Sequence, residues 1–265
     1  MSLQRQPEVN PVSQAHLIAE IRRIYTRIHT DEAQCIEEDR RHAEAIRSAA
    51  PGQRPTFSEK QWRRQIALHR SVLNEHHNFF LATQHPSASA ACRRLPSKYG
   101  MPARLSRHGI HSFLDILRCS LPESLEHMLC FIYLAYSMVA LLYETVEAFK
   151  NSWIECLGDL ARYRMAVEDE NPRDREIWSA NARSWYLQAA DKSPLVGRLY
   201  HHLGILARTN ALDQLHLYGR ALTLVQVFAS ARESCPFSSS RSSEAPRSPT
   251  SDAFPWNRPS SRLML

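Results

Sequence analysis

The eight residues LGDLARYR at 157–164 decide the fold of this 265-residue chain, together with the stretch LYHHLGILA at 199–207. Both stretches place a Leu-Gly pair inside a run of good helix formers. The chain has only 7 glycines, so a glycine within a helix is unexpected unless the position requires it. A glycine there lets a second helix approach closely, because no side chain keeps the two backbones apart. The two stretches therefore predict tightly packed pairs of helices.

The residues that follow each stretch indicate a repeat of helix pairs. A tetratricopeptide unit has about 34 residues, with a small-residue contact in its first helix and aromatic, Ala and Pro markers in its second. The first copy is marked by Leu157, Gly158, Tyr186, Ala189 and Pro194, with an insertion expected at 166–178. The second copy is marked by Tyr200, Leu203, Gly204, Tyr218 and Ala221. We interpret them as two degenerate tetratricopeptide-type pairs; a plain helical bundle with chance matches is the alternative.

Helical patterns continue through most of the chain. Apolar residues recur at every third or fourth position over 15–47, and Ser58 is a suitable N-cap for a helix that follows. The stretch 93–107 is basic and broken by Pro and Gly, which predicts a connector with a short helix. Further helices are expected at 108–118, 123–149, 151–167, 174–191, 197–208 and 211–230. No segment shows sustained strand alternation, so we predict an all-α fold, an antiparallel helical array.

Composition divides the chain into three expected parts. An N-terminal amphipathic helix and linker occupy 1–56, and a helical domain occupies 57–235. Residues 236–265 are rich in Ser, Pro and Arg. Such a segment buries too little apolar surface to fold, so we expect a disordered tail.

Sequence features argue against catalysis, metal binding and membrane insertion. The six cysteines form no Cys-x-x-Cys pair, and the adjacent histidines at 76–77 and 201–202 diverge by about 100° on a helix. Phosphate-binding glycine loops and nucleophile elbows are lacking. The most apolar stretch, 129–143, is shorter than the roughly 20 residues of a membrane span. We expect it to be a buried core helix, with Cys130 and Cys156 as small buried residues. The predicted class is a non-enzymatic binding protein without cofactor or metal.

Four stretches make the sequence resemble a known family. They are GDLARYR at 158–164, ARSWY at 182–186, GRLYHHLGILA at 197–207 and SARES at 230–234. They resemble the Ever-Shorter-Telomeres/Smg family of telomerase-associated and nonsense-mediated mRNA decay factors. The segment NFFLATQHP at 78–86 is similar to filamentous-fungal members in particular. The resemblance extends over roughly residues 57–234.

The resemblance implies a 14-3-3-like helical domain with a concave groove that takes a phosphoserine. It also implies a location in nucleus and cytoplasm, and a heterodimer with a related family member. After Ser234 this chain turns Ser-rich where family members continue with an apolar helical segment. We interpret that departure as a truncated product or a mis-joined gene model.

Four residues are the candidates for phosphoserine binding. The resemblance assigns Arg162 and Tyr163, from the GDxARY motif, to the pocket. Arg63 follows Trp62 in an aromatic-basic pattern, and Arg70 stands two helical turns further on the same face. Arginine suits a phosphate because its planar fork offers paired donors.

Other interpretations of these arginines stay open at this point. Arg63 and Arg70 are equally well explained as solvated surface arginines. Arg162 lies in a stretch that should be packed, so its charge needs a partner, and both Asp159 and a phosphate are candidates.

Two functions fit the sequence. The first is an adaptor of nonsense-mediated mRNA decay that binds a phosphorylated RNA helicase. The alternative is a telomerase-associated protein that binds single-stranded DNA or RNA through its basic surface, in keeping with the net charge of +6. Single-strand binding prefers aromatic residues among the basic ones, and the connector at 93–107 offers only Tyr99. We therefore rank the adaptor first.

Overall fold

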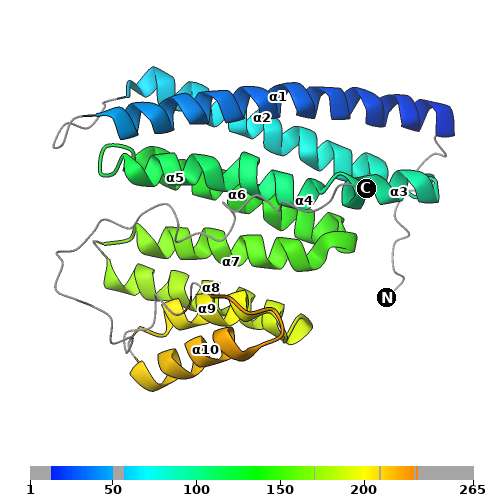
Figure 1. Ribbon diagram of the computed structural model, residues 1–265. Coiled ribbons are helices and arrows are strands. Elements are labelled where there is room, and N and C mark those ends of the chain that lie inside the picture. The colour runs from blue at the N-terminus through cyan, green and yellow to red at the C-terminus, as the bar shows by residue number, and fades with distance from the viewer. Residues whose placement is uncertain (1–12, 50–56, 170, 209, 230, 232–265) are drawn as a thin grey trace, which may run out of the picture. The chain divides into compact units, whose positions relative to one another are not determined.

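The computed structural model describes residues 13–49, 57–169, 171–208, 210–229 and 231, and these residues form an all-α protein (Figure 1). The predicted fold class, a helical array, is confirmed. The helices are α1 (Gln14–Ser48), α2 (Glu59–Thr83), α3 (Ala90–Lys98), α4 (Met101–Arg104), the π-helix η1 (Leu105–His111), α5 (Ser112–Cys119), α6 (Leu125–Thr145), the 3₁₀-helix η2 (Glu147–Phe149), α7 (Lys150–Ala166), α8 (Pro172–Lys192), α9 (Gly197–Leu206) and α10 (Ala211–Thr223).

Internal contacts divide the chain into two compact units, one ending at Trp178 and the other starting at Ser179. The expected boundary at residue 56 falls within the first unit, in which α1 packs along α2. The tail that we expected at 236–265 lies outside the described residues.

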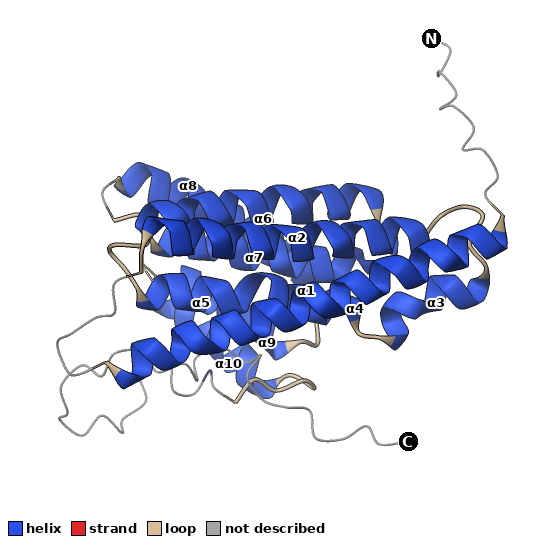
Figure 2. Ribbon diagram, turned by 90° about the horizontal axis from the view of Figure 1, so that it is seen from above, coloured by secondary structure: helices blue, strands red, loops and turns tan. Residues whose placement is uncertain are grey.

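In the first unit, α1 and α2 form a long antiparallel pair (Figure 2). Three contacts show that the two helices are antiparallel, because residue numbers increase along α1 while those of the contacting residues in α2 decrease. Arg27 pairs with Glu75 at 2.7 Å, the Ser71 hydroxyl donates to Asp31, and Gln65 donates to Asp39 at 2.6 Å. Apolar residues of α1 at helical spacing face this partner, as the sequence predicted; they are Leu17, Ile21, Ile24 and Ile28. Ser58 caps α2 through a capping box with Gln61, as expected.

The segment η1–α5 contacts both α2 and α7. Gly109 accepts a hydrogen bond from His69 at 3.0 Å and Phe113 contacts Trp62, so the segment runs antiparallel to α2. A helix was expected over 108–118, but the helix starts at Leu105 with a π-helical turn. The expected connector at 93–107 is more ordered than predicted. It holds α3 and α4, which are separated at Gly100, whose φ of 59° is left-handed.

Helix α6 is buried on one face only. Phe131 and Met128 are fully buried, whereas Tyr133 is 77% exposed. Cys130 is exposed and our expectation for it was wrong, but Cys156 is buried as expected. With 21 residues, α6 is longer than the apolar stretch suggested. Within the described part of the chain, it alone is long and apolar enough to cross a membrane, a property shared by core helices of soluble proteins.

In the second unit, α9 and α10 make the closest helix contact. A Cβ added at Gly204 would lie 2.6 Å from the Tyr218 ring, so the predicted close approach at this glycine is confirmed. The ring of Tyr186, in α8, stacks on His202 at 5.0 Å. The stretch 166–178, expected as an insertion, instead mostly extends α8 at its N-terminal end.

Replacing Gly197 by Ala should lower the free energy of unfolding by about 2 kcal/mol. The added methyl would lie 2.4 Å from the Ala221 carbonyl oxygen and 2.7 Å from that of Gln226, and backbone atoms cannot swing aside. Gly219 in α10 is the control, because nothing lies within 4 Å of the place that an added methyl would take there. Gly219→Ala should stabilise by roughly 0.5–1 kcal/mol through helix propensity. Urea unfolding followed by circular dichroism measures the change in the free energy of unfolding for each variant. A change of the same sign in Gly197→Ala and Gly219→Ala would contradict this packing.

Buried His76 should make stability fall in mild acid. Burial lowers its pKa from 6.5 to about 4, and Nε2 has no hydrogen-bond partner among the described residues. Between these pH values the unfolded chain binds a proton that the folded chain does not, so the free energy of unfolding decreases as pH falls. From pH 7 to pH 5 the loss should be about 2 kcal/mol. His76→Leu should abolish that part of the loss in urea titrations at both pH values. The control is His29→Leu, at an exposed position of α1. An unchanged pH dependence in His76→Leu would show that His76 is not responsible.

Candidate functional site

Helix α7 carries the motif GDLARYR, and all of its residues from Cys156 to Tyr163 are buried. A helix that is buried around its whole circumference is normally apolar on every side. This one nevertheless contains Asp159 and Arg162, which are 5% and 9% exposed. Two opposite charges in such a place need each other, since an unpaired buried charge is costly.

Arg162 and Asp159 form an ion pair one helical turn apart. The Arg162 Nη2 atom donates to Asp159 Oδ1 at 3.2 Å. The second carboxylate oxygen, Oδ2, faces His111 of η1, whose Nε2 lies 3.6 Å away. Asp159, one of the two partners considered from the sequence, is thus in contact with Arg162.

Tyr163 links α7 to α5 by its hydroxyl group. The hydroxyl donates to Asp115 Oδ1 at 3.2 Å, and Arg118 Nη2 lies 3.5 Å from the same oxygen. Burial raises the pKa of the Tyr163 hydroxyl, so this group stays protonated near neutral pH. Burial also raises the pKa of the Asp115 carboxyl, and Arg118 and His111 act against that shift. The hydrogen bond that the Tyr163 hydroxyl donates to Asp115 therefore connects α7 to α5.

Three residues of this cluster escaped the sequence analysis: His111, Asp115 and Arg118. Their spacing of four and three residues places them on one face of the helical segment that runs from η1 into α5. That spacing was the available signal. It does not reveal that α7 is the neighbour, because Asp115 and Tyr163 are 48 residues apart.

Arg63 and Arg70 lie on the solvent side of α2. The side chain of Arg63 is 77% exposed and pairs with Glu59 at 2.7 Å. Glu59 in turn lies 2.9 Å from His127 of α6. Arg70 has no ion pair within the described residues. Arg162 and Tyr163 are buried in α7 instead, so the four candidates form an exposed pair and a buried pair.

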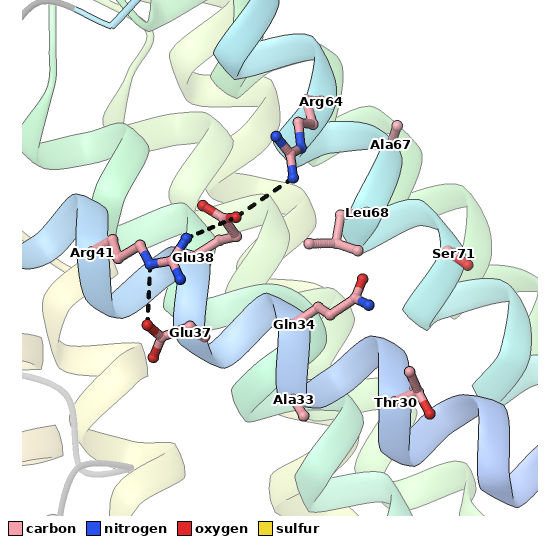
Figure 3. A pocket seen from close by; sticks show the side chains of 10 residues that line it. All are labelled: Thr30, Ala33, Gln34, Glu37, Glu38, Arg41, Arg64, Ala67, Leu68 and Ser71. Carbon is pink, nitrogen blue, oxygen red and sulfur yellow. Dashed lines mark hydrogen bonds and ion pairs between the residues drawn. The ribbon is translucent and has the colours of Figure 1, made fainter.

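A separate groove lies between α1 and α2 (Figure 3). Its volume is about 670 Å³, and Ala33, Ala67 and Leu68 contribute its apolar lining. Figure 3 shows the charged side chains at one end bound to one another: Arg41 pairs with Glu37 and Glu38, and Arg64 reaches Glu38. None of the four candidate residues lines this groove. Two carboxylates, Glu37 and Glu38, line the groove beside its two arginines, so the lining carries no net positive charge to attract a phosphate.

Metal ligands are not grouped anywhere in the described part of the chain: no three His, Cys, Asp or Glu side chains come together there. His76 and His201, each from one of the two histidine pairs, are buried in their own helices. We assign no metal or cofactor site.

Comparison with known proteins relates part of this chain to proteins of mRNA decay and telomere biology. No family model matches the chain. It is 23% identical to EST/SMG-like protein 2 of Saccharomyces cerevisiae over 151 residues, 56% of this chain and 12% of that protein. It is 39% identical to zebrafish (Danio rerio) telomerase-binding protein EST1A over 82 residues, 30% of this chain and 5% of the relative. The third is nonsense-mediated mRNA decay factor SMG7 of Arabidopsis thaliana, 37% identical over 79 residues, 29% of this chain and 7% of the relative.

The chain is similar to EST/SMG proteins over part of its length. The predicted resemblance to this family is thereby confirmed. The aligned parts span only 5–12% of the length of these relatives.

Proposed function

We propose that this EST/SMG relative is a non-enzymatic adaptor of nonsense-mediated mRNA decay that binds a phosphoserine segment of a phosphorylated RNA helicase. The observation that carries the proposal is the buried cation Arg162 in the GDLARYR helix. Support comes from a relative named as a nonsense-mediated mRNA decay factor. In this proposal the protein works in nucleus and cytoplasm, through a 14-3-3-like groove, and pairs with a related family member.

Each candidate residue has a distinct task in the proposed site. Arg162 supplies a guanidinium whose orientation is fixed by Asp159, so little side-chain freedom is lost when an anion binds. Tyr163 places its ring beside that guanidinium, with 5.4 Å from Cζ to the ring centroid. Its hydroxyl is bound to Asp115, so Tyr163 supports the site rather than donating its proton to phosphate.

In the proposed phosphoserine site, the exposed residues Arg63 and Arg70 attract the phosphate from a distance and form the outer edge of the site. Arg63 and Arg70 lie two turns, about 10 Å, apart on one face of α2. Their exposure lets both side chains turn toward an incoming dianion, at the cost of releasing Glu59 from Arg63. An exposed ion pair is worth less than about 1 kcal/mol, so this exchange is cheap compared with a charge-assisted bond to phosphate.

The second candidate function is binding of single-stranded DNA or RNA, in line with a relative named as telomerase-binding. Its basis is the basic segment α3–α4. One of its charges is already neutralised, because Arg104 pairs with Glu32. The side chain of Arg93 is held by a hydrogen bond to the Pro86 carbonyl. Fewer cations remain for phosphates than the sequence suggests, so this function ranks second.

Charge reversal at Arg63 should weaken binding of a serine-phosphorylated helicase peptide at least tenfold. One charge-assisted bond is worth about 1.5–3 kcal/mol, and the new carboxylate adds repulsion. The matched control is Arg64→Glu. Arg64 is the neighbouring residue and is equally exposed, but it faces α1 and Glu38. This control should change the affinity less than twofold. Fluorescence anisotropy with phosphorylated and unphosphorylated forms of the same peptide measures the effect.

Two outcomes of that titration would refute the phosphoserine site. One is equal affinity for both peptide forms. The other is an equal loss in Arg63→Glu and Arg64→Glu, which would indicate unspecific attraction. The second function would be favoured instead if oligonucleotide affinity falls steeply with rising salt, with a slope of log affinity against log salt concentration that corresponds to several phosphate contacts.

A further inference from the structure

A second pocket opens between α1 and α3, away from Arg63, Arg70, Arg162 and Tyr163. We call it the α1–α3 pocket. Its volume is about 450 Å³, and its lining includes Phe79 of α2 and Ile21 of α1, both buried. Leu95 of α3 is a further lining residue, and Ile18 lines it as a partly exposed residue. The volume falls within the roughly 300–1,000 Å³ of ligand-binding pockets.

Aromatic rings line the pocket in a continuous series. The Tyr25 ring lies 5.9 Å from that of Phe79 and 4.9 Å from that of Tyr99, centroid to centroid. Tyr99 is 39% exposed, so the series runs from the buried interior to solvent. Rings of this kind offer a large apolar contact area and a hydroxyl that accepts or donates hydrogen bonds.

The charged groups at this pocket are all cationic. Arg22 lines it, and Lys98 Nζ lies 5.7 Å from the Tyr99 centroid. Neither has an ion pair within the described residues. The one nearby cation that is neutralised is Arg104, which lies over Tyr25 and pairs with Glu32. No acidic residue lines the pocket in the described part of the chain. An apolar cavity with an unneutralised basic rim therefore results.

We propose that the α1–α3 pocket docks an acidic peptide segment of a partner protein. One large apolar side chain of the segment fills the cavity, and flanking carboxylates pair with Arg22 and Lys98. Charge complementarity selects this occupant. The chain's own residues 236–265 do not suit it, since they carry four Arg against one Glu and one Asp.

The lining also favours a peptide over a nucleic acid. Tyr25 and Tyr99 pack against each other at 4.9 Å, which leaves no gap for a base between them. The aliphatic walls formed by Ile18, Ile21 and Leu95 offer no partner for the hydrogen-bonding edge of a base. An aliphatic or aromatic side chain matches these apolar walls.

A library of random twelve-residue peptides displayed on phage tests the proposal. Selection on the full chain should enrich peptides with one large apolar residue flanked by Asp or Glu. The best peptide should bind Ile18→Asp and Arg22→Glu at least tenfold more weakly than the unaltered chain, because each variant adds a negative charge at the pocket. Ile36→Asp is the matched control: Ile36 is also an exposed isoleucine of α1 but does not line the pocket. It should change affinity less than twofold, and so should Arg63→Glu, which separates this site from the phosphoserine site.

A chemical footprint gives a second measurement on the unaltered protein. Tyr99 lines the pocket and is 39% exposed, whereas Tyr133 of α6 is exposed elsewhere. The bound peptide should slow hydroxyl-radical oxidation of Tyr99 and leave that of Tyr133 unchanged, as followed by mass spectrometry. The proposal is overturned if no acidic peptide is enriched, or if the selected peptide binds Ile18→Asp and Ile36→Asp equally. It is also overturned if oligo(dT) or oligo(U), rather than the peptide, protects Tyr99.

Discussion

The buried carboxylate of Asp159, which meets Arg162 of its own helix and His111 of η1, is the constraint on which the packing of α7 against the segment η1–α5 depends. A guanidinium at 9% exposure is tolerated only where a counter-charge meets it. Asp159 meets it from one turn away, and His111 approaches the same carboxylate from η1. Together with the bond from Tyr163 to Asp115, these contacts fix how α7 lies beside the segment η1–α5. The neighbouring contact of Gly109 with His69 then ties that segment to α2.

The polar contacts of the first unit therefore form a connected framework, and its binding surfaces are attached to that framework. Arg63 and Arg70 are exposed on α2, the helix whose buried face holds His69. The α1–α3 pocket uses the opposite end of α2, where Phe79 forms part of its lining. The two proposed sites thus lie on the same helix, and they take partner segments of different chemistry: a phosphorylated one and an acidic one with a large apolar side chain.

Local sequence patterns predicted those features that depend on neighbours in the chain. The helices followed from periodicity, the α2 N-cap from Ser58, and the Asp159 contact from its position three residues before Arg162. The close approach at Gly204 followed from the presence of a glycine within a helix of a glycine-poor chain. Features that depend on distant residues were not predictable in this way. The tyrosine pair of the α1–α3 pocket joins residues 74 positions apart, Tyr25 and Tyr99, and the sequence analysis singled out only Tyr99. The exposed Cys130 was missed because an apolar stretch does not tell which face of a helix is covered.

The most direct test of the phosphoserine site is a crystal structure of the full chain with a serine-phosphorylated helicase peptide. The phosphate should lie within hydrogen-bonding distance of the Arg162 guanidinium, with Arg63 turned away from Glu59 toward the same phosphate. A phosphate bound elsewhere, with the contacts Arg162–Asp159 and Arg63–Glu59 both unchanged, would contradict the assignment.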